Sequence, residues 1–299
     1  MRTDKTQPDI IDDNAHGPDH RSGSDSQPVE DRNDDLGGIA RPRRRSSSLV
    51  GGFNLLKWTV SLGLVLVVWE LLARSGMVNR TLFPTVGDTL GAGVELWEAG
   101  FVVTDTLSSL SRALVGFVIG AVVGILVGVL TGSLRYMDFL LSPMITVFRP
   151  IPAIALVPLA TVWFGIGEQA KWFVIAYTVF LAVWLNVHAG VSSVSETHLR
   201  VASSLGASRM RTFREVVMPA AAPDIVGGLR YGAAVAFIVL VAAELAGAQS
   251  GLGFRIQVSG QFLQTDRIFF GLMQLGVLGA LLDSAFVALS SKFVHWGER

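Results

Sequence analysis

Two charged side chains lie inside long apolar runs of this 299-residue chain. Arg149 lies in the run FRPIPAIALVP, and Glu244 lies in VAAELAGAQSGLG. An ionisable group at membrane depth is costly, and it is by default a functional-site hypothesis. Both residues are therefore candidates for a polar translocation pathway or its gate. The alternatives are that Arg149 extends to the membrane interface or pairs with a carboxylate, and that Glu244 pairs with an arginine or lies near the outer interface.

Several prolines accompany Arg149 in the same apolar run. Proline cannot donate a helical hydrogen bond, so this stretch is expected to be kinked or partly unwound. Irregular backbone at membrane depth is tolerated only where protein or a water-filled cavity covers it. Pro150 and Pro152, which follow Arg149 most closely, are assigned to the same candidate pathway. The prolines of the run are Pro143, Pro150, Pro152 and Pro158.

The sequence contains no recognisable catalytic constellation. Gly165-Ile166-Gly167 precedes Lys171 without the spacing or the strand–loop–helix context of a phosphate-binding loop. The five histidines form no metal-ligand pair on a helix face, and no Ser or Thr lies in a nucleophile elbow. The absence of Cys excludes disulfides and thiolate ligands. We expect no enzymatic activity and no cofactor, so a partner or an ion gradient must supply the energy for any uphill transport.

Residues 195–223 form a polar segment between two apolar runs, and they predict two short amphipathic helices hinged at Gly206. Ser208 can cap the second helix, which Pro219 and Pro223 are expected to end. A helix pair in a loop indicates a surface that is presented to a partner. Its apolar faces are expected to consist of Leu199, Ala202 and Leu205 in the first helix and Met210, Phe213 and Val217 in the second.

The elements that position these residues belong to a chain too apolar for an ordinary soluble domain. It is 51% hydrophobic and 16% charged, with a mean hydropathy of +0.50. A helix needs about 20 residues to cross the bilayer core. The sequence therefore predicts an all-α, multi-pass membrane protein with six spans near residues 54–73, 108–132, 140–164, 170–191, 228–249 and 268–290.

Residues 1–50 are predicted to be a disordered cytoplasmic tail ahead of a transmembrane domain at 51–299. The tail is rich in Asp, Asn, Gly, Pro and Ser, so it cannot bury enough apolar surface to become ordered. Its basic run RPRRR at 41–45 predicts a topological anchor and not a nucleic-acid site, because many carboxylates precede it. No signal peptide is expected, since the first apolar run begins late and no cleavage site follows it.

Lys and Arg near the span ends predict the orientation. Most of them flank the first span, the turn at 132–140, the loop at 192–227 and the C-terminal end. The intervening loops are poorer in basic residues or are balanced by acids. Both termini and the predicted helix pair are therefore expected to face the cytoplasm.

A row of glycines recurs every four residues along the second predicted span. Small residues let two helix backbones approach closely in lipid. The row is expected to pack against a neighbouring span, or alternatively against another subunit. Its members are Gly116, Gly120, Gly124, Gly128 and Gly132.

The polar segment resembles the cytoplasmic loop of permease subunits of bacterial ABC importers, with the pattern EAA, three residues, Gly, and a helix ending in Leu-Pro. The corresponding residues here run from Arg200 to Ser208, with Met218-Pro219 in place of Leu-Pro. Further resemblance lies in RPIPAIALVPLATVWFGIGEQAK, AAELAGAQSGLG and FLQTD. Together these motifs resemble the branch that imports nitrate, aliphatic sulfonates, taurine and bicarbonate, over roughly residues 54–293.

The resemblance implies a type I importer permease with a five-helix core and one peripheral helix, paired as a homodimer in the bacterial plasma membrane. Two copies of an ABC ATPase subunit are expected to dock on the helix-pair loops, and an extracytoplasmic solute-binding protein to deliver the solute. ATPase closure would then move the helix pairs as rigid bodies. The implied coupling residues are Leu199, Arg200, Ala202, Leu205, Gly206, Ser208, Met210, Phe213, Val217 and Pro219.

One departure from the family pattern concerns charge. Arg200 stands where the family has Glu, and Val201 stands where it has the first Ala. Arg200 therefore needs an acidic counterpart, or the ATPase contact depends on the apolar face and Gly206 alone.

Two alternatives to an importer subunit remain open. A secondary carrier or channel would favour paired acids in the spans and an inverted repeat, whereas the spans hold few carboxylates (Glu70, Glu244 and Asp283) and no clear repeat. An intramembrane enzyme would need a Ser/His, Asp/Asp or metal set, and only His188 lies in a span. The arginine in a broken helix is compatible with an anionic solute, which stays a hypothesis.

Overall fold

The computed structural model describes the backbone of residues 48–293 and the side chains of residues 60–288 and 290. The chain divides into two units, residues 1–56 and 57–299. The contacts described below all lie within the second unit. Of the predicted tail, residues 1–47 lie outside the described residues, so that prediction stays a prediction.

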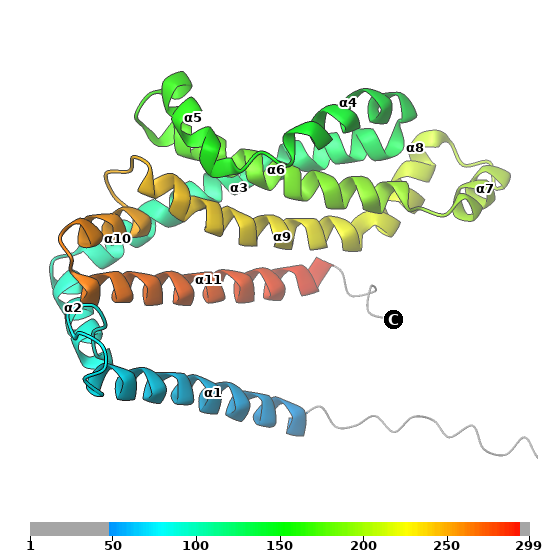
Figure 1. The fold of residues 1–299 in the computed structure, drawn as a ribbon. Helices are drawn as coiled ribbons and strands as arrows, with labels where there is room; N and C mark the ends of the chain where they lie inside the picture. The colour runs from blue at the N-terminus through cyan, green and yellow to red at the C-terminus, as the bar shows by residue number, and fades with distance from the viewer. Residues whose placement is uncertain (1–47, 294–299) are drawn as a thin grey trace, which may run out of the picture. The chain divides into compact units, whose positions relative to one another are not determined.

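Every regular element among the described residues is helical (Figure 1). Two of the elements are short irregular turns, the 3-10 turn η1 and the π-helical turn η2. In chain order the elements are α1 (Ser48–Arg74), α2 (Val86–Glu98), α3 (Phe101–Ser133), α4 (Arg135–Phe148), η1 (Ala153–Leu156), α5 (Val157–Phe164), α6 (Glu168–Ser192), α7 (Glu196–Ser204), α8 (Arg209–Thr212), η2 (Phe213–Val217), α9 (Met218–Leu245), α10 (Leu252–Gln261) and α11 (Thr265–Phe293).

Four helices among the described residues are long and apolar enough to cross a membrane. They are α3, α6, the helix that runs from α8 to the end of α9, and α11. They match the second, fourth, fifth and sixth predicted spans. The first predicted span coincides with α1, part of whose side chains lie outside the described range.

The third predicted span is broken, as its prolines indicated. α4 and the η1–α5 segment meet at an angle of 90°. The break lies at Pro150 and Pro152, whereas Pro143 lies inside α4 and Pro158 lies in the first turn of α5. A proline in the first helical turn loses no intrahelical bond. The run at 140–164 therefore consists of two helices joined at a sharp break, in agreement with the predicted kink or unwinding.

α3 and α6 lie side by side and run in the same direction, with the glycine row of α3 facing α6. A Cβ added at Gly124 would lie 2.9 Å from the Cβ of Val183, and one at Gly128 would lie 2.7 Å from the Cβ of Val187. Real Cβ atoms do not approach so closely, so glycine allows this helix–helix distance. The row packs within the chain, which was the first of the two alternatives.

α9 packs against α6 in the opposite direction. Gly228 of α9 faces Asn186, and Gly190 of α6 faces Asp224. The side chains enclosed by α3, α6 and α9 are apolar and almost fully buried, and they include Ile175, Val179, Val183, Val187, Ala236 and Leu240.

Pro219 and Pro223 do not end the second amphipathic helix, so that prediction is wrong. The helix continues from α8 through η2 into α9. In the wide π turn, the N–H of Met218 bonds to the carbonyl of Phe213. Pro219 directly follows this π turn, near the start of α9. Pro223 is accommodated inside a long apolar helix.

The two ends of the helix bundle carry different elements (Figure 1). α3 and α6 both begin near α10, which contacts the start of α3 through an ion pair between Arg255 and Asp105. Both helices finish at the other end, where α6 leads into α7. The start of α9 lies at that same end. The polar helix pair and the α9–α10 loop therefore lie at opposite ends of the bundle.

Candidate functional site

The segment between α6 and α9 forms the predicted helix pair. The Ser195 hydroxyl caps α7 by accepting the N–H of Thr197. The hinge at Gly206 is confirmed: its φ of +74° lies in the left-handed region, which side chains other than glycine rarely adopt. The Ser208 hydroxyl caps α8 by accepting the N–H of Arg211. Local sequence signals thus predicted this part of the fold correctly.

The helix pair exposes apolar side chains at the end of the bundle. Leu205 is 82% exposed, Met210 is 60% exposed and Val201 is 53% exposed. A groove of about 400 Å³ lies between α7 and the start of the following helix, lined by Val201, Leu205 and Val216 among others. An apolar surface of this kind is typical of an interaction site.

Not every residue of the predicted apolar faces is exposed. Ala202 is buried, and Leu199, Phe213 and Val217 are partly buried. Leu205 lies at the C-cap of α7 and lines the same groove as Ala202. The exposed and buried members therefore have different environments: the first are free to meet a partner, and the second hold the helix pair in place.

Two arginines of the helix pair each form an ion pair with a glutamate four residues away. Arg200 lies 2.7 Å from Glu196, and Arg211 lies 2.9 Å from Glu215. All four side chains are exposed, so each pair contributes little stability. Glu196 is an acidic counterpart for Arg200, within α7 itself.

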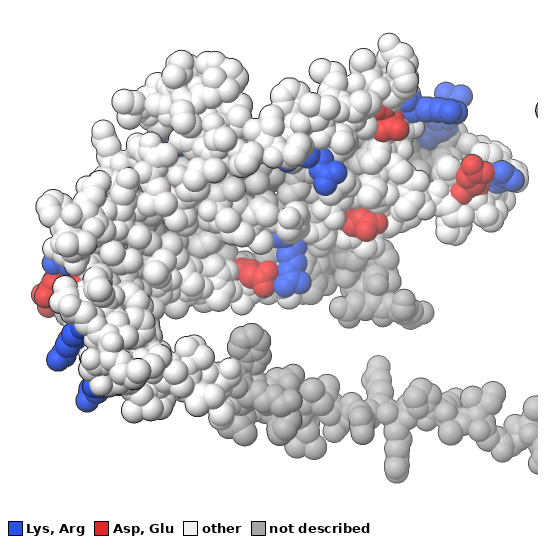
Figure 2. Space-filling model, viewed as in Figure 1, with Lys and Arg blue, Asp and Glu red and all other residues white. Residues whose placement is uncertain are grey.

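A stretch of the visible face next to the α10 end shows no charged side chain, whereas charged side chains lie at that end itself and from the middle of the face to the α7–α8 pair (Figure 2). An exposed ion pair joins Arg230 of α9 to Asp283 of α11. An uncharged stretch is what a lipid-facing surface requires.

Glu244 is fully buried and pairs with an arginine, which was one of its alternatives. One of its carboxylate oxygens accepts bonds from Arg112 at 2.8 Å and from the Ser109 hydroxyl at 2.7 Å. The other accepts the backbone N–H of Gly253 at 2.8 Å. The carboxylate is therefore fully satisfied inside the protein.

Arg112 is the centre of this buried network. Its side chain is 4% exposed and donates two bonds to Glu168, at 2.5 and 2.8 Å. It also donates to the carbonyl and the hydroxyl of Ser250. The guanidinium thus joins α3 to the start of α6, the end of α9 and the loop before α10. A planar fork with five donors suits such a junction.

The same network holds the glycine-containing loop between α9 and α10 in place. The N–H of Gly251 donates to Asp105, and the N–H of Leu252 donates to Ser109. Gly251 has a φ of +116°, and a Cβ there would collide with the carboxylate of Glu244. Glycine is needed at this position because the backbone passes close to the Glu244 carboxylate, and not because the loop must be mobile.

Sequence reasoning missed Arg112 and Asp105. Arg112 lies inside the second predicted span, so the rule that singled out Glu244 could have found it. Its pairing with Glu168 and Glu244 could not be found in that way, because these partners lie 56 and 132 residues further along the chain.

Arg149 lies apart from this network. It is exposed at the break between α4 and η1, and it forms no ion pair with any residue that the structure describes. It lines a cavity of about 200 Å³ together with Tyr177 and Tyr231. The Tyr177 hydroxyl donates to the carbonyl of Phe148 at 2.7 Å, which braces the broken segment against α6. The structure thus places Arg149, Pro150 and Pro152 together and Glu244 elsewhere.

Comparisons with known proteins agree on one family. The family model described as "Binding-protein-dependent transport system inner membrane component" matches residues 107–295. A probable ABC transporter permease protein of Brucella abortus (strain 2308) is 39% identical over 248 residues, covering 83% of this chain and 96% of that protein. The putative aliphatic sulfonates transport permease protein SsuC of Escherichia coli (strain K12) is 34% identical, covering 80% of this chain and 90% of that protein.

A further relative and a solved structure are similar in part. The taurine transport system permease protein TauC of Escherichia coli (strain K12) is 41% identical over 157 residues, which cover 52% of this chain and 57% of TauC. The MetNI methionine ABC transporter in an inward-facing conformation superimposes with a TM-score of 0.55 at 21% identity, covering 62% of this chain and 93% of that one. At that identity the likeness concerns the fold alone.

The family match extends over more than half of the chain, and relatives over 30% identical cover most of it. This chain belongs to the family of inner membrane components of binding-protein-dependent transport systems, as a multi-pass ABC transporter permease subunit and not as an enzyme.

Proposed function

We propose that this chain forms the translocation pathway of an ATP-driven importer and that α7 and α8 are the surface on which a separate ATPase subunit acts. The observation that carries the proposal is the exposure of Leu205, Met210 and Val201 on a helix pair at one end of the bundle. Exposed apolar side chains beside a groove suit a protein partner. Phe213, Val217 and Pro219 lie where the pair continues into α9, so they are suited to transmit a displacement.

The connection between this surface and the membrane is stiff. α8, η2 and α9 form one continuous helix from Arg209 to Leu245. α7 is anchored through buried Ala202. A push on the helix pair is therefore expected to move α9 as a unit, which supports rigid-body coupling.

The proposed assembly contains two copies of this chain and two ATPase subunits. The ATPases would bind at the α7–α8 end, in the cytoplasm with both termini. An extracytoplasmic solute-binding protein would bind at the opposite end, near α2 and α10. Family membership supports these partners, and the distribution of Lys and Arg supports the orientation.

The proposed solute is a small sulfonate or a related anion. Two relatives with substantial identity are named for taurine and for aliphatic sulfonates. Arg149, exposed at the helix break beside Pro150 and Pro152, is the proposed pathway residue. Glu244 would have a positioning role through Arg112 and would not line the pathway.

Co-purification tests the proposal. The detergent-solubilised wild-type chain is expected to bring down an ATP-hydrolysing subunit from its native host. Leu205→Asp is expected to reduce the recovered ATPase by about tenfold, because a charge would be buried without a partner in the contact. Gly206→Val is expected to act in the same direction, since it would change the angle between α7 and α8.

A matched control is Leu82→Asp, in the loop before α2 at the other end of the bundle. Leu82 is 62% exposed, so both aspartates enter exposed positions without disturbing the core. Recovery of the ATPase with Leu82→Asp and not with Leu205→Asp would support the proposed surface. If the wild-type chain recovered no ATPase, the secondary carrier would become the leading function.

A further inference from the structure

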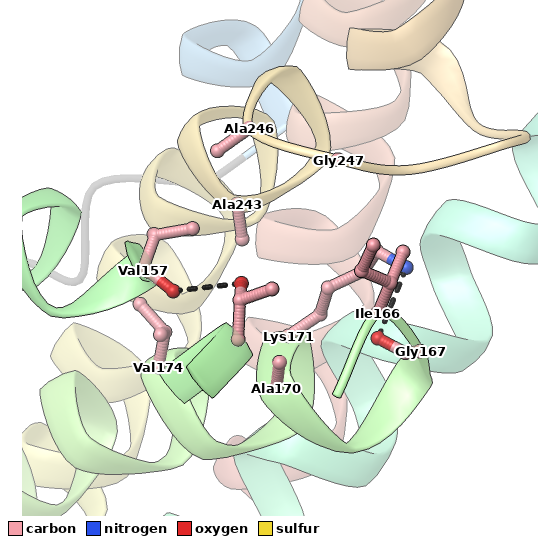
Figure 3. A pocket seen from close by; sticks show the side chains of 10 residues that line it. Val157, Ile166, Gly167, Ala170, Lys171, Val174, Ala243, Ala246 and Gly247 are labelled. Carbon is pink, nitrogen blue, oxygen red and sulfur yellow. Dashed lines mark hydrogen bonds between the residues drawn. The ribbon is translucent and has the colours of Figure 1, made fainter. Parts of the chain in front are cut away.

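A small cavity with two chemically different ends lies between α5, α6 and the end of α9 (Figure 3). Its volume is about 150 Å³. Val157 and Val174 line one end, and Lys171 lies toward the other end beside Gly167. Ala243 lies between these two ends. The cavity shares no lining residue with the Arg149 cavity or with the groove of the helix pair.

The Lys171 ammonium has room for one more partner. Its side chain is 8% exposed, and its Nζ donates to the carbonyl of Gly167 at 3.2 Å and to Glu168 at 3.3 Å. An ammonium group has three N–H donors, so one donor is left. Among the described residues, no contact uses that third donor. A buried donor of this kind favours an anionic or carbonyl oxygen.

Binding an anion at Lys171 would not leave a carboxylate unpaired. Glu168 receives two bonds from Arg112, at 2.5 and 2.8 Å, in addition to its contact with Lys171. Arg112 can therefore keep Glu168 satisfied while Lys171 turns toward a ligand. The charges of Arg112, Lys171, Glu168 and Glu244 sum to zero. A bound monoanion would therefore give this cluster a net charge of −1, whereas a dianion would give it −2, which is much less favourable to bury.

We infer that this cavity binds a small aliphatic monoanion, a short-chain sulfonate or carboxylate, with its headgroup at Lys171 and its alkyl chain between Val157 and Val174. The volume admits only a few heavy atoms besides the headgroup, since drug-sized ligands occupy pockets of about 300 Å³ or more. The alkyl chain matches the apolar walls. The site deepens the proposed function, on which it rests, by placing a station for the solute at the end of the bundle away from the helix pair.

The same walls predict which related molecules are rejected. Taurine carries an ammonium at the far end of its chain, which would lie against valine and alanine side chains. Burial of a charge without a partner is strongly unfavourable. Ethanesulfonate and propanoate are therefore expected to bind, whereas taurine and ethylammonium are expected to compete poorly.

Equilibrium binding to the purified full-length chain, with any subunits that accompany it, tests the inference. Radiolabelled ethanesulfonate and propanoate are the probes. Lys171→Met, which keeps most of the length of the side chain and removes the charge, is expected to weaken binding by about tenfold or more. Lys171→Arg is expected to recover most of that loss. Preference for one probe identifies the headgroup as sulfonate or carboxylate.

A second variant keeps Lys171 and fills the space. Ala246 lines the cavity but is exposed, so Ala246→Leu is expected to fold and to block binding. Val162→Leu, on the exposed side of α5, is the matched control and should bind as the wild type does. The inference is overturned if the wild type binds neither probe saturably, or if both Lys171→Met and Ala246→Leu bind unchanged.

The amount of ATPase in the same preparations separates this inference from the proposed function. If the chain recovers no ATPase but binds an anion saturably and in a way that depends on Lys171, the proposed importer function is contradicted and the proposed binding site is supported. If the chain recovers an ATPase but binds neither anion, the proposed importer function is supported and the proposed binding site is contradicted.

Discussion

At the scale of single residues, Arg112 determines how the α10 end of the bundle is held together. Its guanidinium meets Glu244, Glu168 and Ser250, and its neighbour Asp105 meets Arg255. Arg255 also lies over the ring of Phe101, 3.8 Å from its centroid. A buried ion pair of this kind adds little to the free energy of unfolding when compared with apolar residues of the same volume. Removal of one partner, however, is strongly destabilising, because the other charge stays buried without a counter-ion. The network therefore specifies one arrangement of α3, α6 and α9.

Removal of Arg112 is expected to destabilise the protein. In Arg112→Met, Glu244 would remain buried without its cation, at a cost of about 3 kcal/mol or more in the free energy of unfolding. The control is Arg230→Met, which breaks a pair whose side chains are 54% and 55% exposed and is expected to cost less than about 1 kcal/mol. Thermal unfolding in detergent measures both. Equal midpoints for the two variants would contradict the assigned role of the network.

At the scale of elements, the contact between α3 and α6 depends on the glycine row. Hydrophobic burial does not drive helices together in lipid, so close packing must hold them. The row allows the α3 backbone to approach the valines of α6, and α9 covers another side of α6.

A larger side chain in the row is expected to separate the two helices. Gly124→Val would place its Cβ 2.9 Å from that of Val183 and is expected to cost about 1–3 kcal/mol. Gly276→Val on α11 is the control, because no atom lies within 4 Å of a Cβ added there. The fraction of protein that remains monodisperse after heating in detergent reports the difference. If Gly276→Val were as unstable as Gly124→Val, the loss of stability could not be attributed to the short distance between α3 and α6.

At the scale of the whole molecule, the orientation in the membrane decides which end can meet the proposed ATPase. The basic loops predict that the α7–α8 end and the turn between α3 and α4 face the cytoplasm. The loop between α1 and α2 would then lie on the outer side.

Single cysteines test this orientation, because the natural chain has none. Met77→Cys and Tyr136→Cys introduce thiols at positions that are 85% and 71% exposed. In intact spheroplasts a membrane-impermeant maleimide is expected to label Met77→Cys alone, and Tyr136→Cys only after lysis. The reverse pattern would place the helix pair outside and would exclude it as an ATPase surface.

The sequence by itself determined the features that depend on neighbouring residues. Apolar length located the four membrane-crossing helices, the prolines located the break near Arg149, and Gly206 and Ser208 located the helix pair. Each of these signals acts over a few turns of chain, so composition and spacing suffice to find them.

Only the tertiary structure decided the pairing of distant residues. It joined Arg112 to carboxylates 56 and 132 residues away, held the α9–α10 loop through bonds to α3, and continued the helix past Pro219 after the π turn. It also brought Lys171 to a cavity closed by α5 and the end of α9. The physical reason is that a buried charge must find its partner in space, and the sequence records the charge without recording which helix will lie beside it.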